Sequence, residues 1–189
     1  MYTKLIIIFS FSFLYGFFEI FMSLRKRPER KIIKSGDKMS VWILSFFISL
    51  GYSLAFSIAS TKIGRIYNWD TFFATGSILV IIGLIIRIKS ILTLKEQFTY
   101  TITKIENHKL IETGLYKFIR HPGYLGQLII FLGIATSLSN WLSILLMMIS
   151  VSIGFIYRIR NEENFLKEQM GSKYLDYQKR TKKLIPMIY

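Results

Sequence analysis

Long apolar runs separated by short polar segments dominate the chain. The runs cover residues 5–22, 41–59, 71–86, 123–139 and 141–157. A hydrocarbon core about 30 Å thick requires roughly 20 helical residues, and the five runs reach or approach that length. The pattern predicts an all-α integral membrane protein with five transmembrane helices.

The first run is also compatible with a secretory signal peptide. Only Lys4 precedes it, it has no small-residue cleavage site, and it is long for the apolar region of a signal peptide, so a retained helix is favoured. Glu19 lies near its inner end, either at the headgroup level or facing a ligand cavity. The third run extends toward residue 92 through Arg87 and Lys89, whose side chains are expected to snorkel to the interface.

The last two runs are joined by little more than Asn140, so they are predicted to form an antiparallel helical hairpin. Small residues on both runs are expected to let the two backbones approach closely. These residues are Gly126, Gly133, Thr136, Ser143, Ser150, Ser152 and Gly154.

Two further segments carry their own patterns. Residues 99–105 alternate as TYTITKI, which favours a short extended segment. Residues 161–182 place apolar side chains at helical spacing between lysines, which predicts an amphipathic helix that either lies on the membrane or covers a site. Its apolar residues are Phe165, Leu166, Met170, Tyr174 and Tyr177. The chain thus divides into a three-helix transmembrane region, residues 1–98, and a core region, residues 99–189.

Charge orients these elements. The net charge is +14, which in a soluble protein would suggest nucleic acid, but here the charge lies between apolar runs, so no nucleic-acid partner is expected. Of the 25 Lys and Arg residues, 22 fall within 23–40, 87–122 and 158–189. The positive-inside rule then predicts a multi-pass protein of the cell membrane, with its N-terminus outside and its C-terminus in the cytoplasm. The basic loop at 25–38 follows from this topology, or else binds anionic lipid.

The composition removes several kinds of chemistry. The chain has no cysteine, so thiol catalysis and disulfides are excluded. Its two histidines, His108 and His121, do not stand at a metal-ligand spacing, so no metal site is expected.

Arg120, His121 and Pro122 form the first candidate cluster. Pro122 suits the first position of a helix and keeps His121 out of helical geometry. His121 would then lie at a helix N-terminus, where free N–H groups can hold an anion, and Arg120 adds a bidentate donor. The same residues also suit an ordinary basic membrane boundary with a helix-starting proline.

Arg158 and Glu162 form the second cluster. They are four residues apart and share a helix face, either as a simple salt bridge or as part of a site, while Glu163 is expected to point elsewhere. The hairpin brings this face beside Arg120 and His121, so a concave site is expected. Nearby aromatic residues are Tyr100, Tyr116, Phe118 and Tyr124.

The order of these motifs carries a family resemblance. HKLIETGLYKFIRHPGYLG, an apolar stretch, and then RIRNEENFLKEQMGSKYLDYQKRTKKLIP resemble the isoprenylcysteine carboxyl methyltransferase family, including its small five-helix prokaryotic members. That family looks related to membrane phospholipid N-methyltransferases. The resemblance covers residues 99–186, whereas the first three helices match only in number and character.

The resemblance implies a membrane methyltransferase that uses S-adenosyl-L-methionine and releases S-adenosyl-L-homocysteine. Nothing in the sequence demands a partner subunit, so a monomer is expected. Glu162 would close the cofactor pocket under the amphipathic helix, and Arg158 would face the lipid acceptor, so these two are the implied catalytic residues. The implied cofactor-binding residues are Glu162 together with His108, Lys109, Leu110, Ile111, Tyr116, Arg120, His121, Pro122, Gly123 and Tyr124. Leu115 departs from the proline common in relatives, and Thr101 from a glutamine seen in some.

The acceptor is expected to be lipophilic and to enter from the bilayer. O-methylation of a carboxylate or acidic hydroxyl, as on an isoprenylcysteine, is favoured because Arg158 suits an anionic acceptor. The alternatives are phospholipid amine N-methylation, a membrane reductase that uses NADPH, and a non-catalytic lipid-binding protein with the same fold.

Overall fold

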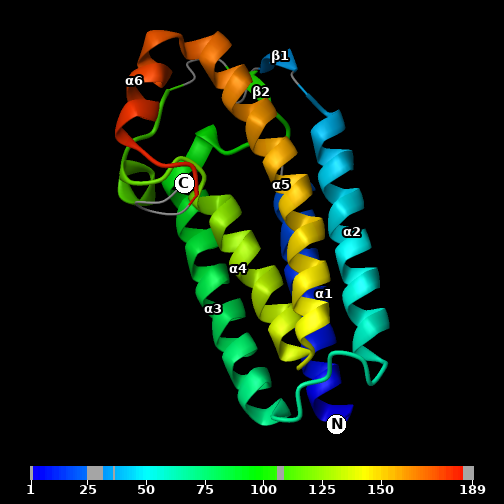
Figure 1. The fold of residues 1–189 in the computed structure, drawn as a ribbon. Helices are drawn as coiled ribbons and strands as arrows, with labels where there is room; N and C mark the ends of the chain where they lie inside the picture. The colour runs from blue at the N-terminus through cyan, green and yellow to red at the C-terminus, as the bar shows by residue number, and fades with distance from the viewer. Residues whose placement is uncertain (1, 25–31, 36, 106–108, 185–189) are drawn as a thin grey trace.

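A computed structural model of the chain describes residues 2–24, 32–35, 37–105 and 109–184 (Figure 1). Its helices are α1 (Tyr2–Leu24), α2 (Met39–Ala59), α3 (Trp69–Leu94), α4 (Pro122–Ser137), α5 (Trp141–Met170) and α6 (Ser172–Arg180). Two 3-10 turns, η1 (Lys95–Gln97) and η2 (Gly114–Lys117), and two short strands, β1 (Ile32–Ser35) and β2 (Thr103–Ile105), complete the described elements.

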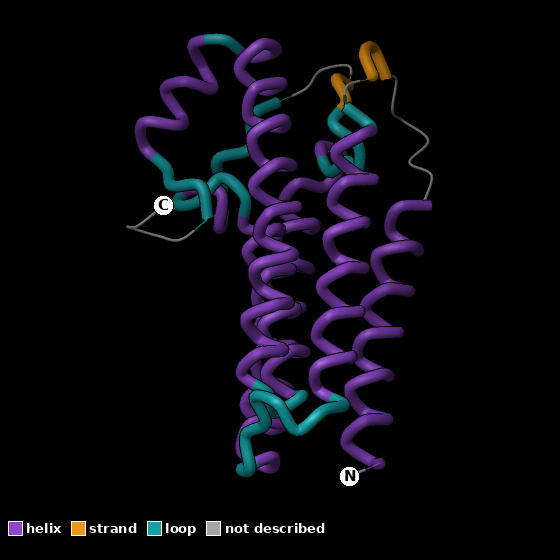
Figure 2. Tube along the Cα trace, turned by 45° about the vertical axis from the view of Figure 1, so that its right-hand side comes forward, coloured by secondary structure: helices purple, strands orange, loops and turns teal. Residues whose placement is uncertain are grey.

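The long helices run side by side in an elongated bundle, with connecting segments at its two ends (Figure 2). Helices α1, α2, α3 and α5 are long and apolar enough to cross a membrane, and α4 is an apolar helix of 16 residues. The predicted fold class, a multi-pass helical membrane protein with a C-terminal hairpin, is confirmed.

The extended segment is shorter than predicted. Only Thr103–Ile105 forms a strand, which pairs antiparallel with β1. Residues 99–102 instead form a loop that lines the cavity described below.

The predicted amphipathic helix at 161–182 is not one separate element. Helix α5 continues from the apolar run through Glu162 to Met170, and α6 starts only at Ser172. Gly171 separates them with a φ of 56°, a left-handed conformation that glycine adopts at little cost. Helix α6 therefore turns back toward the bundle (Figure 1).

Glycines bring α3 and α4 together, which corrects the expectation that small residues serve the α4–α5 contact. A Cβ added at Gly133 would lie 2.6 Å from the carbonyl oxygen of Gly76, and one added at Gly126 would lie 2.8 Å from that of Gly83. Neither position admits a larger residue without movement of the backbone. Gly126 and Gly133 of α4 therefore each face a glycine of α3.

Small residues of α5 likewise face a neighbouring helix, α2, at close range. Ser143 Oγ donates to the carbonyl of Ala55 at 2.7 Å, and Ser150 Oγ donates to that of Phe47 at 2.6 Å. Helix α4 thus packs against α3, and α5 packs against α2. Because α4 and α5 run antiparallel, the start of α4 and the polar end of α5 lie at the same end of the bundle (Figure 1). The hairpin prediction is confirmed in direction, although its partners differ.

Candidate active site

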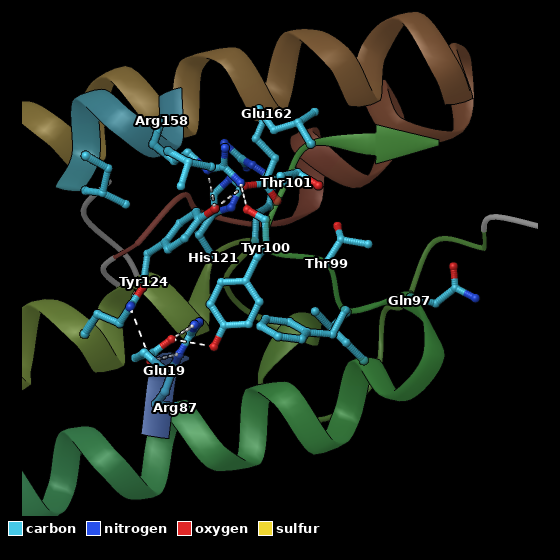
Figure 3. A pocket seen from close by; sticks show the side chains of 18 of the residues that line it. Glu19, Arg87, Gln97, Thr99, Tyr100, Thr101, His121, Tyr124, Arg158 and Glu162 are labelled. Carbon is cyan, nitrogen blue, oxygen red and sulfur yellow. Dashed lines mark hydrogen bonds and ion pairs between the residues drawn. The ribbon is translucent and has the colours of Figure 1, made fainter. Parts of the chain in front are cut away.

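A cavity of about 590 Å³ lies at the end of the bundle where α4 begins (Figure 3). Small-molecule and cofactor sites usually have about 300–1,000 Å³. Its walls come from α1, α2, the C-terminal part of α3, the segments at 97–103 and 109–116, the start of α4, the polar end of α5, and α6. The first two helices therefore line the cavity and do more than support it.

Most predicted site residues line this cavity. Pro122 is fully buried as the first residue of α4 and is not among the lining residues, and His108 lies outside the described residues. Phe118 is 60% exposed and turns away. The predicted residues that line the cavity are Lys109, Leu110, Ile111, Tyr116, Arg120, His121, Gly123, Tyr124, Arg158 and Glu162.

Glu163 corrects the sequence prediction, because its side chain points into the protein beside the start of α4. It is 5% exposed, and its Oε1 accepts from Nε of Arg120 at 2.7 Å and lies 3.4 Å from Nε2 of His121. The i, i+4 spacing favoured Glu162, but helix α5 places Glu163 against α4. Glu163 is thus the buried counterion of Arg120.

Arg120 also holds the chain that follows α6. Its Nη1 donates to the carbonyls of Gln178 and Thr181, and its own backbone N–H donates to the carbonyl of Lys182 at 2.8 Å. The side chain therefore fastens the C-terminal segment against the loop before α4. Arg120 has fewer free donors for a bound anion than the sequence suggested.

Arg158 and Glu162 meet through Tyr124. The Tyr124 hydroxyl donates to Oε2 of Glu162 at 2.5 Å and accepts from Nε of Arg158 at 3.2 Å. The other nitrogens of Arg158 donate to the carbonyl of Tyr100 and the hydroxyl of Ser40. Arg158 is 3% exposed, so the structure gives it a fixed orientation.

Five further polar residues line the cavity on the side of α1 and α3; we call them the Glu19 cluster. It consists of Glu19, Arg87, Tyr100, Gln127 and Tyr15. Arg87 donates to both oxygens of Glu19 at 2.9 Å, and the Tyr100 hydroxyl donates to Glu19 at 2.6 Å. Gln127 Nε2 donates to the Tyr15 hydroxyl at 2.8 Å.

The prediction that Arg87 snorkels to the interface is wrong. Arg87 is 4% exposed, because Glu19 neutralises its charge inside the bundle and its guanidinium lies 5.3 Å from the ring centre of Phe98. Of the two predictions for Glu19, the structure supports the one in which it faces a cavity. Arg87 and Gln127 were missed as site residues, although their polar side chains within or beside apolar runs were a usable signal.

The polar end of α5 and helix α6 cover the cavity. All five apolar residues predicted for the amphipathic face, from Phe165 to Tyr177, line it. Burial raises the pKa of Tyr116, Tyr174 and Tyr177, so these phenols stay protonated near neutral pH. Tyr177 donates to the carbonyl of Tyr116 at 2.6 Å, whereas the buried hydroxyl of Tyr174 has no hydrogen-bond partner among the described residues.

Apolar spans that enclose a cavity with ionised and aromatic walls are typical of integral membrane proteins that bind amphiphilic molecules. The comparisons with known proteins agree. The family model of phospholipid methyltransferases matches residues 71–173. Protein-S-isoprenylcysteine O-methyltransferase B of Arabidopsis thaliana is 33% identical over 159 residues, which are 78% of this chain and 80% of the relative. Protein-S-isoprenylcysteine O-methyltransferase of Mus musculus is 26% identical over 187 residues, which are 92% of this chain and 65% of the relative.

A solved structure is also similar. The eukaryotic intramembrane Ras methyltransferase, isoprenylcysteine carboxyl methyltransferase, matches with a TM-score of 0.63 and 26% identity over 76% of this chain. The match covers 52% of that protein, so this chain corresponds to about half its length. The chain belongs to the isoprenylcysteine carboxyl methyltransferase family. It is a multi-pass membrane methyltransferase.

Proposed function

We propose that this methyltransferase transfers a methyl group from S-adenosyl-L-methionine to the carboxylate of a lipophilic, isoprenylcysteine-like acceptor. The observation that carries the proposal is the composition of the cavity at the start of α4. Its wall under α6 carries aromatic and ionised side chains, and its wall on α2 carries the aliphatic side chains of Val41, Leu44 and Ile48. A polar cofactor and a lipid acceptor can therefore meet within it.

The residues under α6 fit the proposed cofactor. The buried Tyr174 hydroxyl lacks a hydrogen-bond partner among the described residues, so a polar group of a bound ligand can supply that hydrogen bond. Glu162 and the faces of Tyr116 and Tyr124 suit a sulfonium, which is attracted by carboxylates and aromatic rings. The residues proposed to hold the cofactor are His108, Lys109, Leu110, Ile111, Tyr116, Arg120, His121, Pro122, Gly123, Tyr124 and Glu162.

The chain's own residues contribute position and charge. The cofactor, when bound, supplies an activated methyl group and leaves as S-adenosyl-L-homocysteine. An ionised carboxylate needs no base to accept a methyl group, so exclusion of water and alignment dominate. Arg158 supplies a fixed positive charge that stabilises the anionic acceptor, and Glu162 orients Tyr124 through its hydrogen bond.

Methylation of a phospholipid amine is the second candidate, since the matching family model describes phospholipid methyltransferases. The buried positive charge of Arg158 favours an anionic acceptor over an ammonium. Within this proposal residues 99–189 form the cofactor-binding core, and residues 1–98 supply spans and acceptor contacts. The protein is proposed to be monomeric and to lie in the cell membrane with the site on the cytoplasmic side.

Methyl transfer tests the proposal directly. The purified protein in liposomes is given S-adenosyl-L-methionine labelled in its methyl group, with N-acetyl-S-farnesylcysteine or phosphatidylethanolamine as acceptor. The proposal predicts that the label is transferred to N-acetyl-S-farnesylcysteine. The product is a methyl ester, so alkali should release the label as methanol. Label only in phosphatidylethanolamine would establish the second candidate, and label in neither would refute the proposed acceptors.

A further inference from the structure

One part of the cavity runs along the bundle between α1 and α2; we call it the α1–α2 arm. It is lined by one face of α1, from Ser12 to Ile20, and by one face of α2, from Val41 to Tyr52. On α4 the lining reaches Phe131 and goes no further among the described residues. The arm leads from the polar end of the bundle in among the apolar helices, so it suits the apolar chain of an acceptor.

Gly16 of α1 faces this arm without bringing α1 and α2 together. It lines the cavity, and an added Cβ there would meet no neighbouring atom within 4 Å. The glycines between α3 and α4 behave differently, since an added Cβ at Gly133 would lie 2.6 Å from the carbonyl oxygen of Gly76. Small residues usually allow helices in a membrane to touch. Here the small side chain instead leaves room between α1 and α2 for a bound chain.

Three aromatic side chains close the far end of the arm; we call Tyr15, Tyr52 and Phe131 the aromatic floor. Phe131 lies edge-on to Tyr15 and to Tyr52, with ring centres 6.0 Å apart in both pairs. Behind the floor, Phe56 stacks on Tyr52 with ring centres 6.0 Å apart and contacts Phe9 of α1 at 5.1 Å. Neither Phe9 nor Phe56 lines the cavity, so the cavity ends at the floor.

The position of Tyr52 on α2 sets the length of the arm. Nη1 of Arg158 donates to the hydroxyl of Ser40, so Ser40 marks the end of the arm where the acceptor carboxylate is proposed to lie. Tyr52 follows twelve residues later on the same helix, which is about 18 Å at 1.5 Å per residue. An extended S-farnesylcysteine, with three isoprene units, has about this length. A geranylgeranyl chain exceeds it by one unit.

We propose that the aromatic floor limits the prenyl chain of the acceptor to three isoprene units. The inference rests on the proposed methylation of an isoprenylcysteine-like carboxylate. A longer chain must displace the floor or fold back within the arm. Tyr15 and Phe131 are buried at 6% and 1% exposure, and packed side chains do not move aside without cost. The floor therefore selects the acceptor and takes no part in the transfer of the methyl group.

A series of acceptors that differ only in chain length tests this inference. N-acetyl-S-geranylcysteine, its farnesyl analogue and its geranylgeranyl analogue are given to the full chain in liposomes. In wild type the farnesyl acceptor should have a kcat/KM about tenfold above that of the geranylgeranyl acceptor. Tyr52→Ala opens the floor as far as Phe56, one helical turn or about 5.4 Å further on. This variant should raise the geranylgeranyl-to-farnesyl ratio of kcat/KM about tenfold.

Phe46→Ala is the matched control, because it removes an aromatic ring of the same helix that is 61% exposed and lies outside the cavity lining. It should leave the ratio as in wild type, and comparison of ratios removes differences in how the acceptors partition into the bilayer. Gly16→Phe is a second variant with the opposite effect, and its added Cβ meets no neighbouring atom. It fills the arm short of the floor, so the geranyl-to-farnesyl ratio should rise about tenfold.

The outcomes separate the chain-length limit from the proposed function. Equal kcat/KM values for the farnesyl and geranylgeranyl acceptors in wild type would overturn the limit while methyl transfer itself stands. An unchanged ratio in folded Tyr52→Ala or, if that variant does not fold, in Gly16→Phe would do the same. Methylation of none of the three acceptors by wild type would refute the proposed function, and the limit with it.

Discussion

Glu162 and Glu163 are neighbours on α5, yet their side chains meet different surroundings. Glu163 is buried against Arg120 and His121, whereas Glu162 lines the cavity and accepts only from Tyr124 among the described residues. Removing one partner of a buried ion pair leaves the other charge uncompensated, and this commonly costs several kcal/mol.

Glu163→Gln should therefore destabilise the protein by about 3 kcal/mol, since Arg120 loses its counterion. Glu162→Gln should leave stability nearly unchanged and weaken cofactor binding. Thermal unfolding in detergent and binding of S-adenosyl-L-homocysteine are measured on both variants. A destabilised Glu162→Gln with a stable, weakly binding Glu163→Gln would contradict the roles assigned to the two residues.

The Tyr174 hydroxyl provides a second prediction for a single residue. Because it has no partner among the described residues, its removal in Tyr174→Phe should not lower the thermal stability of the cofactor-free protein. If the cofactor completes this hydroxyl, the variant should bind S-adenosyl-L-homocysteine roughly tenfold more weakly. Tyr157→Phe, on a partly exposed residue outside the cavity lining, is the control. Unchanged affinity in Tyr174→Phe would remove Tyr174 from the site.

Sequence patterns found some of these residues and missed others for physical reasons. The helix-starting Pro122 and the shared face of Arg158 and Glu162 are local features, and local spacing predicts them. The pairing of Glu19 with Arg87 joins residues 68 positions apart and depends on how α1 lies against α3. Local spacing contains no information on that placement.

At the scale of helices, the contact between α3 and α4 depends on paired glycines. Gly133→Ala should destabilise the protein by about 1–3 kcal/mol, because its Cβ would overlap the carbonyl oxygen of Gly76 and the backbones must separate. Gly16→Ala on α1 meets no atom within 4 Å and should be neutral or slightly stabilising. Thermal unfolding of both variants measures the difference. Equal stability would contradict the close approach of α3 and α4.

The sequence predicted the positions of the helices better than it predicted which helices pack against each other. Run length and the short turn at Asn140 were enough for the spans and the hairpin, and the glycine at 171 was not recognised as the end of α5. Small residues indicated close packing but not against which neighbour. The matched spacing of seven residues, Gly76 to Gly83 on α3 and Gly126 to Gly133 on α4, was the signal that would have indicated it.

For the whole molecule, the distribution of charge predicts the orientation in the membrane. Native cysteine is absent, so single cysteines can be introduced at the exposed residues Lys62 and Lys173 without background. In intact cells a membrane-impermeant maleimide should label Lys62→Cys, and it should label Lys173→Cys only after permeabilisation. The opposite labelling would place the cavity on the outer side and overturn the proposed topology.

The central claim is that the cavity under α6 holds the methyl-donor cofactor. The most direct measurement is calorimetric titration of the detergent-purified protein with S-adenosyl-L-homocysteine, beside Glu162→Ala and with NADPH as a second ligand. The account predicts saturable binding of S-adenosyl-L-homocysteine to wild type, strongly weakened binding to Glu162→Ala, and no signal with NADPH. A folded, monodisperse wild type that binds NADPH, or that binds neither ligand, would contradict it.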